Sequence, residues 1–225
     1  MNTSSHSRAA ADAFTLVELL TVIAIIAILM GLLFPAIGVI KEQARKVQAK
    51  TDVTNIVAAV KTYYTEYGKY PPLAATPSTG ATDDAVGDPQ SGLAAPLDNN
   101  NLFNTLRAID AAPNTTHKLN PRQIVFFEGK RAADLTAPRA GFADGATSTT
   151  VAGNFYDPWG KEYNVILDSN YDNTIDTPYT DFASPNAPRV GCGAFSLGKD
   201  NQLGTKGDKM YKSGTTVSDD VISWQ

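Results

Sequence analysis

The distribution of hydrophobic and polar positions sets an apolar N-terminal segment apart from a mixed remainder. Residues 13–40, AFTLVELLTVIAIIAILMGLLFPAIGVI, form the longest apolar run, which is interrupted only by the carboxylate of Glu18 and by Pro35. At about 1.5 Å of rise per residue, the part from Leu16 to Ile40 makes roughly 37 Å of helix, enough to cross a hydrocarbon core of about 30 Å. A secretory signal peptide is the competing interpretation, but its apolar region is usually about 7–15 residues long and ends in a small-x-small site. The pattern therefore predicts a transmembrane helix over residues 14–40.

The helical pattern continues beyond this run. In residues 41–72, apolar side chains recur at spacings of three and four residues, at Val53, Ile56, Val57, Val60, Tyr63, Tyr64 and Tyr67. Such a stripe is suited to packing on a sheet, and the tyrosines are better explained by packing than by ligand stacking. Gly68, Pro71 and Pro72 follow in YGKYPP and terminate the pattern. We expect one long helix whose second half is amphipathic.

The remainder of the chain alternates between loops and short elements. Residues 73–154 predict a variable insertion, beginning with a loop rich in Ala, Thr, Gly, Pro, Asp and Asn and holding a short helix at 101–109 and a strand or extended segment at 123–129. In residues 155–225, DPWG predicts a turn, and EYNVIL and GAFSLG predict strands of a small antiparallel sheet. The fold class is therefore α+β, with a long N-terminal helix packed on this sheet.

Composition narrows the possible functions. The chain has 225 residues and a net charge of −4, without a broad basic surface, so nucleic acid is not an expected partner. The single cysteine, Cys192, cannot form an internal disulfide, and we interpret it as a buried thiol. Neither histidine has a recognisable triad context, and no phosphate-binding glycine-rich loop is present. The sequence therefore predicts a protein that is not an enzyme.

Glu18 requires its own explanation. A charge at the centre of a membrane span costs about 2.5–3.5 kcal/mol, and less near an interface. Complementing the positive end of the helix returns up to about 1 kcal/mol, which is the simplest explanation of the carboxylate. Ionisable groups inside membranes usually have a function, so a specific partner is the stronger hypothesis.

FTLVELLTVIAIIAIL resembles the N-terminal signature of type IV pilins and type II secretion pseudopilins. The resemblance implies the type IV pilin fold and a prepilin peptidase that cuts between Ala13 and Phe14, removes residues 1–13 as a leader and methylates the new amino group of Phe14. The family usually has glycine before the cut, so Ala13 departs from the pattern.

The same resemblance assigns roles in assembly to Glu18 and Pro35. It implies that Glu18 meets the N-terminal amine of a neighbouring subunit, a charge-assisted pair that favours the filament over membrane storage. Pro35 stands where the family places a helix-bending proline, and it either loosens the helix for packing or only kinks it towards the following domain.

The charge distribution and the family resemblance predict opposite membrane topologies for the chain. Lys41, Arg45, Lys46 and Lys50 outnumber the cations of the leader, so the positive-inside rule directs the C-terminal part to the cytosol. The resemblance implies the reverse, with a cytoplasmic leader, a single pass of the bacterial inner membrane and a periplasmic C-terminal domain. We follow the resemblance, because its signature is more specific than a difference of a few charges.

Two acidic segments are candidates for calcium. In DSNYDNTID, the side chains of Asp168, Asn170, Asp172 and Asp176 stand at positions one, three, five and nine of a calcium-loop pattern. The pattern lacks glycine at position six and the final bidentate glutamate, so a solvated hairpin turn is the better interpretation.

The second segment, from SLGKD to VISW, resembles the C-terminal calcium loop of major pseudopilins. The resemblance implies Asp200, Asp208, Asp219 and Asp220 as ligands, of which Asp220 matches best and Asp208 least. Without the resemblance, this segment reads as a solvated Gly/Asp loop.

Together these features predict a structural subunit, of the major pseudopilin type, in a type II secretion pseudopilus. The partners implied are further copies in a filament, minor pseudopilins, the prepilin peptidase, the inner-membrane assembly platform and, before assembly, membrane lipid. A type IV pilin for adhesion, motility or DNA uptake is the nearest alternative; it is disfavoured because such pilins often close their C-terminal region with a cysteine pair. A membrane-anchored, calcium-dependent binding domain is the alternative from another class.

Overall fold

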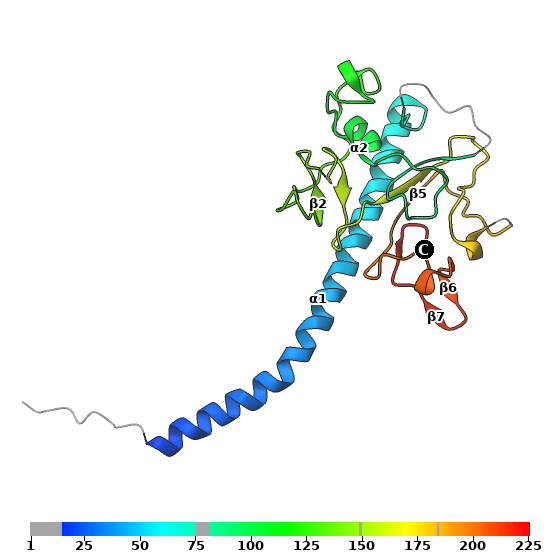
Figure 1. The fold of residues 1–225 in the computed structure, drawn as a ribbon. Helices are drawn as coiled ribbons and strands as arrows, with labels where there is room; N and C mark the ends of the chain where they lie inside the picture. Colours follow the sequence, from blue (N-terminus) through cyan, green and yellow to red (C-terminus); the bar gives the residue numbers. More distant parts are fainter. Residues whose placement is uncertain (1–14, 75–81, 149, 184) are drawn as a thin grey trace, which may run out of the picture. The chain divides into compact units, whose positions relative to one another are not determined.

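The computed structural model describes residues 15–74, 82–148, 150–183 and 185–225 of the chain, without the side chains of residues 32, 35 and 36. The chain divides into two units, residues 1–44 and 45–225. Its elements are a long N-terminal helix and small antiparallel sheets (Figure 1). The fold is α+β, as the sequence predicts, and is consistent with the type IV pilin fold.

Helix α1, Leu16–Tyr67, is the first and longest element. Its apolar stripe is buried where predicted, with Val53, Ile56, Val60 and Tyr63 fully buried. Tyr64 differs, since it is 38% exposed. The helix ends before Gly68, whose positive φ of 68° suits a residue without a Cβ and whose N–H donates to the carbonyl of Tyr64.

The main sheet has four antiparallel strands in the order β1-β4-β5-β8. Their bounds are Asp84–Val86 for β1, Asn164–Leu167 for β4, Cys192–Ser196 for β5 and Val221–Ile222 for β8. Strands β4 and β5 were predicted from their apolar runs, and β1 comes from within the segment that we expected to be a loop.

Both faces of this sheet are buried, and successive residues of β4 alternate between the two sides. Val165 and Leu167 join the cluster formed with α1, whereas Ile166 joins a second cluster with Phe195 and Ile222. The alternation follows from the strand period of two, and burial of both faces explains why the three successive residues 165–167 of β4 are all apolar.

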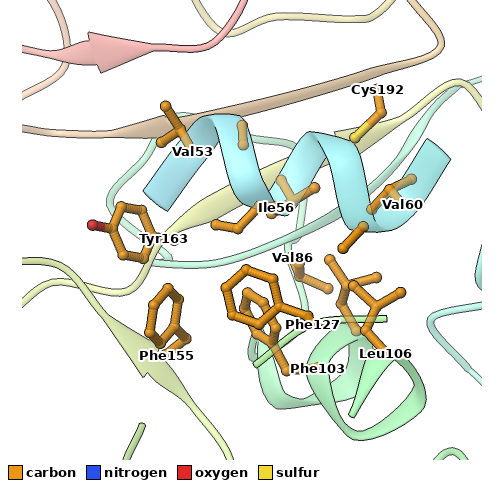
Figure 2. Packing of buried hydrophobic residues seen from close by; sticks show 14 of the residues in the cluster. Val53, Ile56, Val60, Val86, Phe103, Leu106, Phe127, Phe155, Tyr163 and Cys192 are labelled. Carbon is orange, nitrogen blue, oxygen red and sulfur yellow. The ribbon is translucent and has the colours of Figure 1, made fainter. Parts of the chain in front are cut away.

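The larger cluster lies between α1, the sheet and helix α2, Asn100–Leu106 (Figure 2). Phe103 and Leu106 of α2 point towards Ile56 and Val60 of α1, with Phe127 beside Phe103 and Phe155 beside Tyr163. Phe103 contacts Phe127 and Phe155 with ring centroids 5.2 and 5.3 Å apart. The second half of α1 is therefore the central support of the domain.

The remaining elements are short. They are β2 at Gly141–Phe142, β3 at Phe155–Tyr156, β6 at Lys212–Ser213 and β7 at Thr216–Val217, with 3₁₀ turns at Thr115–His117, Thr180–Phe182 and Thr205–Gly207. Strands β2 and β3 pair with each other, as do β6 and β7. The segment 123–129 forms no strand and is held by hydrogen bonds from the N–H groups of Phe126 and Phe127 to the carbonyl of Leu106.

Candidate functional site

The predicted processing site lies at the start of the chain, just before the described structure. Ala13 and Phe14 are outside the described residues, which begin at Thr15. The first described residues already form the start of α1 at Leu16.

Glu18 lies in the first turn of α1, where it forms a capping box with Thr15. Oε2 of Glu18 accepts hydrogen bonds from the backbone N–H and the hydroxyl of Thr15, at 2.9 and 2.8 Å. The Thr15 hydroxyl in turn accepts from the N–H of Glu18 at 3.2 Å. Reciprocal bonds of this kind satisfy the free N–H groups at a helix start. The sequence signal for this capping box is the T-x-x-E spacing of Thr15 and Glu18.

The first half of α1 presents apolar side chains to its surroundings over its whole length. Large exposed side chains run from Leu16, which is 78% exposed, to Ile40, which is 65% exposed. Across the described residues, no helix combines the length and apolarity that a membrane crossing requires. The predicted transmembrane helix over residues 14–40 is therefore not confirmed.

Position 35 lies inside α1, whose bounds run from Leu16 to Tyr67 without interruption. The side chain of Pro35 is outside the described part of the structure. The backbone assignment therefore places the proline within the helix and not at its end.

The C-terminal loop places its four candidate carboxylates mainly against backbone N–H groups. Oδ2 of Asp219 accepts from the N–H groups of Lys199 and Asp200, at 2.7 and 3.2 Å. Oδ1 of Asp200 accepts from the N–H of Gln202, and Oδ1 of Asp208 from that of Met210, both at 2.9 Å. The bonds of Asp200 and Asp208 stabilise local turns, whereas Asp219 connects to a segment about 20 residues earlier in the chain.

Asp220 is the exception among the four. It is only 4% exposed, and its Oδ2 accepts from the N–H of Gly204 at 2.7 Å and from the hydroxyl of Tyr179 at 2.9 Å. Its Oδ1 has no hydrogen-bond partner, and neither has the buried Oδ1 of Asn201. Burial raises the pKa of Asp220 to about 7. An unpartnered buried carboxylate oxygen fits a cation, whereas the other three carboxylates each accept hydrogen bonds from backbone N–H groups.

The segment 168–176 forms a turn held by its own side chains. Asp168 is buried, and its two carboxylate oxygens accept from the N–H groups of Asp172 and Asn173, both at 3.1 Å. Oδ1 of Asn170 also accepts from the N–H of Asp172, at 3.0 Å. Asn173 adopts a φ of 66°, the backbone conformation that glycine provides at this position of a calcium loop.

Asp176, the last residue of the predicted calcium set, lies outside this turn and forms hydrogen bonds with Asp83, which directly precedes β1. Its N–H donates to Oδ2 of Asp83 at 2.8 Å, and its own Oδ2 accepts from the N–H of Asp83 at 3.4 Å. Within the described ranges, no three His, Cys, Asp or Glu side chains form a group that could hold a metal ion. The structure thus assembles neither predicted calcium set as a multi-carboxylate site.

A buried polar network in the middle of the domain was not predicted. Oδ1 of Asp157, in the DPWG turn, accepts from the N–H groups of Trp159, Gly160 and Lys161, and its Oδ2 accepts from the Ser196 hydroxyl at 2.6 Å. Burial raises the pKa of this carboxyl, and the four hydrogen bonds act against the rise. The turn itself was predicted, but its attachment to β5 through Ser196 has no local sequence signal.

Glu162 belongs to the same region. Its carboxylate accepts from the N–H of Asn99 at 3.1 Å and from the side-chain amide of Asn154 at 2.5 Å. Burial raises its pKa to about 7, and the charges of Asp98 and Asp88 add to that rise. Glu162 thereby connects the start of α2 to the segment between β3 and β4.

A hollow of about 310 Å³ opens between α1 and the extended segment at residues 127–130. Gln48, Asp52 and Asn55 of α1 line one side, and Glu128 and Lys130 line the other. Oδ2 of Asp52 accepts from the Tyr163 hydroxyl at 2.7 Å. Burial raises the pKa of Asp52, while the Tyr163 hydrogen bond and the charge of Lys130 act in the opposite direction.

Comparison with known proteins gives one match, at the N-terminus. The prokaryotic N-terminal methylation motif matches residues 8–34, which include Ala13, Phe14 and Glu18. Searches of the curated proteins and of the solved structures found no match. The motif is characteristic of prepilin-type, membrane-anchored proteins that a prepilin peptidase processes and that assemble into pilus-like structures. The N-terminal segment of this chain therefore carries a motif that is characteristic of type IV pilin-like proteins.

Proposed function

We propose that this chain is a structural subunit of a type II secretion pseudopilus, of the major pseudopilin type. The observation that carries the proposal is the N-terminal methylation motif at residues 8–34 followed by an apolar surface that one copy leaves uncovered. Removing the apolar side chains from Leu16 to Ile40 from water lowers the free energy by about 25 cal/mol per Å² of buried surface. Lipid covers them before assembly and neighbouring helices cover them in the filament.

The subunit acts by assembly and catalyses no reaction. The leader is cytoplasmic before cleavage, residues 14–40 anchor the chain in the inner membrane, and the domain that follows lies in the periplasm. The prepilin peptidase, an inner-membrane assembly platform and minor pseudopilins are its partners. Growth of the pseudopilus then drives folded proteins out of the cell.

The state of Cys192 supports a pseudopilin over a type IV pilin. It is the only cysteine in the sequence, and it is free and buried, with a pKa raised to about 12 by burial. A cysteine pair of the kind that closes the C-terminal region of many type IV pilins is therefore impossible in this chain.

Calcium at the C-terminal loop is part of the proposal. Its support is the unpartnered Oδ1 of Asp220, since a buried carboxylate normally has a hydrogen-bond or metal partner. With a cation bound, Asp220 supplies an oxygen ligand and its negative charge, and the turns at Asp200 and Asp219 fix the loop around it.

Deletion of the gene in its own cells, with complementation by the wild-type chain, tests the function. We expect proteins normally found in the medium to accumulate in the periplasm, while surface adhesion, motility and DNA uptake persist. Normal secretion together with loss of any of those three activities would favour a type IV pilus. Normal behaviour in all four assays would contradict both.

A further inference from the structure

Three tyrosine rings lie together on the surface of the unit formed by residues 45–225, and the proposed function uses none of them. The ring of Tyr70 contacts those of Tyr64 and Tyr171, with centroids 4.7 and 5.7 Å apart. Tyr64 is 38% exposed and Tyr171 is 53% exposed. Apolar surface that is exposed in one patch, unlike single scattered side chains, is a common feature of binding sites.

The surrounding chain holds these rings in place. The hydroxyl of Tyr70 lies against Gly191, where an added Cβ would overlap it, so only glycine leaves room for the ring. Burial raises the pKa of Tyr70 to about 12, and its hydroxyl therefore stays neutral. Tyr171 stands in the turn that the carboxylate of Asp168 closes by accepting from two backbone N–H groups. A tyrosine held in this way offers a large contact area at a low cost in conformational entropy.

A hollow of about 150 Å³ opens beside Tyr70 and Tyr171. Its other lining residues are Lys69, Pro71, Pro72, Asp84, Leu167 and Ser169. Apolar walls with a few polar groups are the usual composition of a ligand site. Sites for drug-sized ligands have volumes of about 300–1,000 Å³, so this hollow accommodates a single ring of a ligand.

The polar groups of the hollow decide the charge of its ligand. Lys69 contributes one positive charge and Asp84 one negative charge, and neither side chain has a hydrogen-bond or ion-pair partner among the described residues. The lining therefore has no net charge and favours neither a cation nor an anion. The hydroxyl of Ser169 accepts from the N–H of Asp84 at 2.9 Å, which leaves its own proton for a ligand. A neutral ligand that both donates and accepts hydrogen bonds satisfies all three groups.

We propose that the hollow between Tyr70 and Tyr171 binds one pyranose ring of a neutral, β-linked glycan. A pyranose ring presents C–H groups on its flat face and hydroxyl groups around its edge. The C–H groups stack on the electron-rich face of a tyrosine ring. The hydroxyl groups accept from Lys69 and Ser169 and donate to Asp84. Rings with equatorial substituents, as in β-linked glucose chains, have the flattest face and make the most contacts with an aromatic ring.

Saturation-transfer NMR of the purified full chain with cellotriose tests the site, in a detergent without a sugar headgroup such as lauryldimethylamine oxide. We expect saturable binding, with the strongest transfer to the axial ring protons, which form the face that stacks on tyrosine. Trigalacturonic acid and spermidine, the charged probes, should not compete with cellotriose. Absence of saturable cellotriose binding would overturn the site. Displacement of cellotriose by either charged probe, or by an oligoproline peptide, would also overturn the assignment to a glycan.

Substitutions at Tyr171 separate stacking from folding. Tyr171→Ala should weaken cellotriose binding about tenfold, because the exposed ring is lost, whereas Tyr171→Phe keeps the ring and should bind within about twofold of the wild type. Asp84→Asn removes the charged acceptor and should weaken binding several-fold. Val217→Ala, on β7, is the matched control, since Val217 is also 53% exposed, and it should bind as the wild type does.

Equal affinities of Tyr171→Ala and the wild type would overturn the stacking, and so would equal losses in Tyr171→Ala and Tyr171→Phe. The measurement uses the purified chain and does not depend on a filament. Absence of binding would therefore leave the proposed function intact, and normal secretion after deletion of the gene would leave the glycan site intact.

Discussion

At the scale of single residues, Glu18 has one role that the structure shows and one that we propose. In the single chain it caps α1 through Thr15. The proposed assembly role requires its negative charge as well as its ability to accept hydrogen bonds, because the partner is an amine of another copy. These two contributions can be separated by substitution.

Glu18→Gln keeps an acceptor for Thr15 and removes the charge, so we expect a chain that is inserted and cleaved but assembles poorly. Glu18→Ala should behave in the same way. Thr15→Ala removes the capping partner and keeps the charge, and it should assemble close to normally. Filament yield, with cleavage followed on the same gels, is the measurement. Normal filaments from both Glu18 variants would reject the pairing.

Glu162 predicts a pH dependence of stability. Its pKa rises from 4.5 to about 7 on folding, which at about 1.4 kcal/mol per pKa unit corresponds to at most roughly 3.5 kcal/mol. Between about pH 4.5 and about pH 7, the Glu162 carboxyl loses its proton in the unfolded chain but keeps it in the folded chain. The free energy of unfolding therefore falls as the pH rises through this range, and it levels off above about pH 7.

We expect Glu162→Gln to flatten this decline, measured by urea unfolding of the full chain in detergent at several pH values. The exposed Glu128→Gln is the control and should keep the wild-type profile. A Glu162→Gln chain with an unchanged slope would show that the carboxyl is not desolvated as described.

Asp220 predicts a response to calcium. Calcium should raise the melting temperature of the wild-type chain by several degrees and a chelator should reverse the rise, because a ligand that binds only the folded state stabilises it. Asp220→Ala should melt at one temperature under both conditions. Equal melting temperatures of the wild type with calcium and with chelator would count against the site.

At the scale of elements, the second half of α1 organises the domain. Ile56 is fully buried within the cluster formed with α2 and the sheet. Ile56→Ala should lower the free energy of unfolding by about 2–5 kcal/mol, the usual range for such a truncation in a packed core. The exposed Thr62→Ala on the same helix should change it by less than about 0.5 kcal/mol. Equal effects would contradict the packing.

Sequence patterns predicted those elements that are long enough to show a period. The stripe from Val53 to Tyr67 and the apolar runs of β4 and β5 were sufficient to place the central helix and the two middle strands. Strands of two or three residues, such as β1, β2 and β8, show no period, and their pairing depends on distant partners. The network around Asp157 and Glu162 was missed for the same reason, since Ser196 and Asn99 are remote in sequence.

At the scale of the whole molecule, the chain combines an apolar helical segment that carries the methylation motif with a folded domain. The methylation motif spans the predicted processing site, whereas the described residues hold no group of three His, Cys, Asp or Glu side chains that could bind a metal ion. The reason is physical, because a short recognition motif is contiguous in sequence, while a metal site depends on how loops fold. In the C-terminal set, which the resemblance had assigned to calcium, backbone N–H groups donate to one oxygen each of Asp219, Asp200 and Asp208.

The central claim is that this chain is cut before Phe14 and enters a filament. Intact-mass and N-terminal fragment mass spectrometry of the protein isolated from its own membranes tests it most directly. We predict a mature chain that begins with N-methylated Phe14 and lacks residues 1–13. A mature chain that begins at Met1, or an unmethylated start elsewhere, would contradict the account.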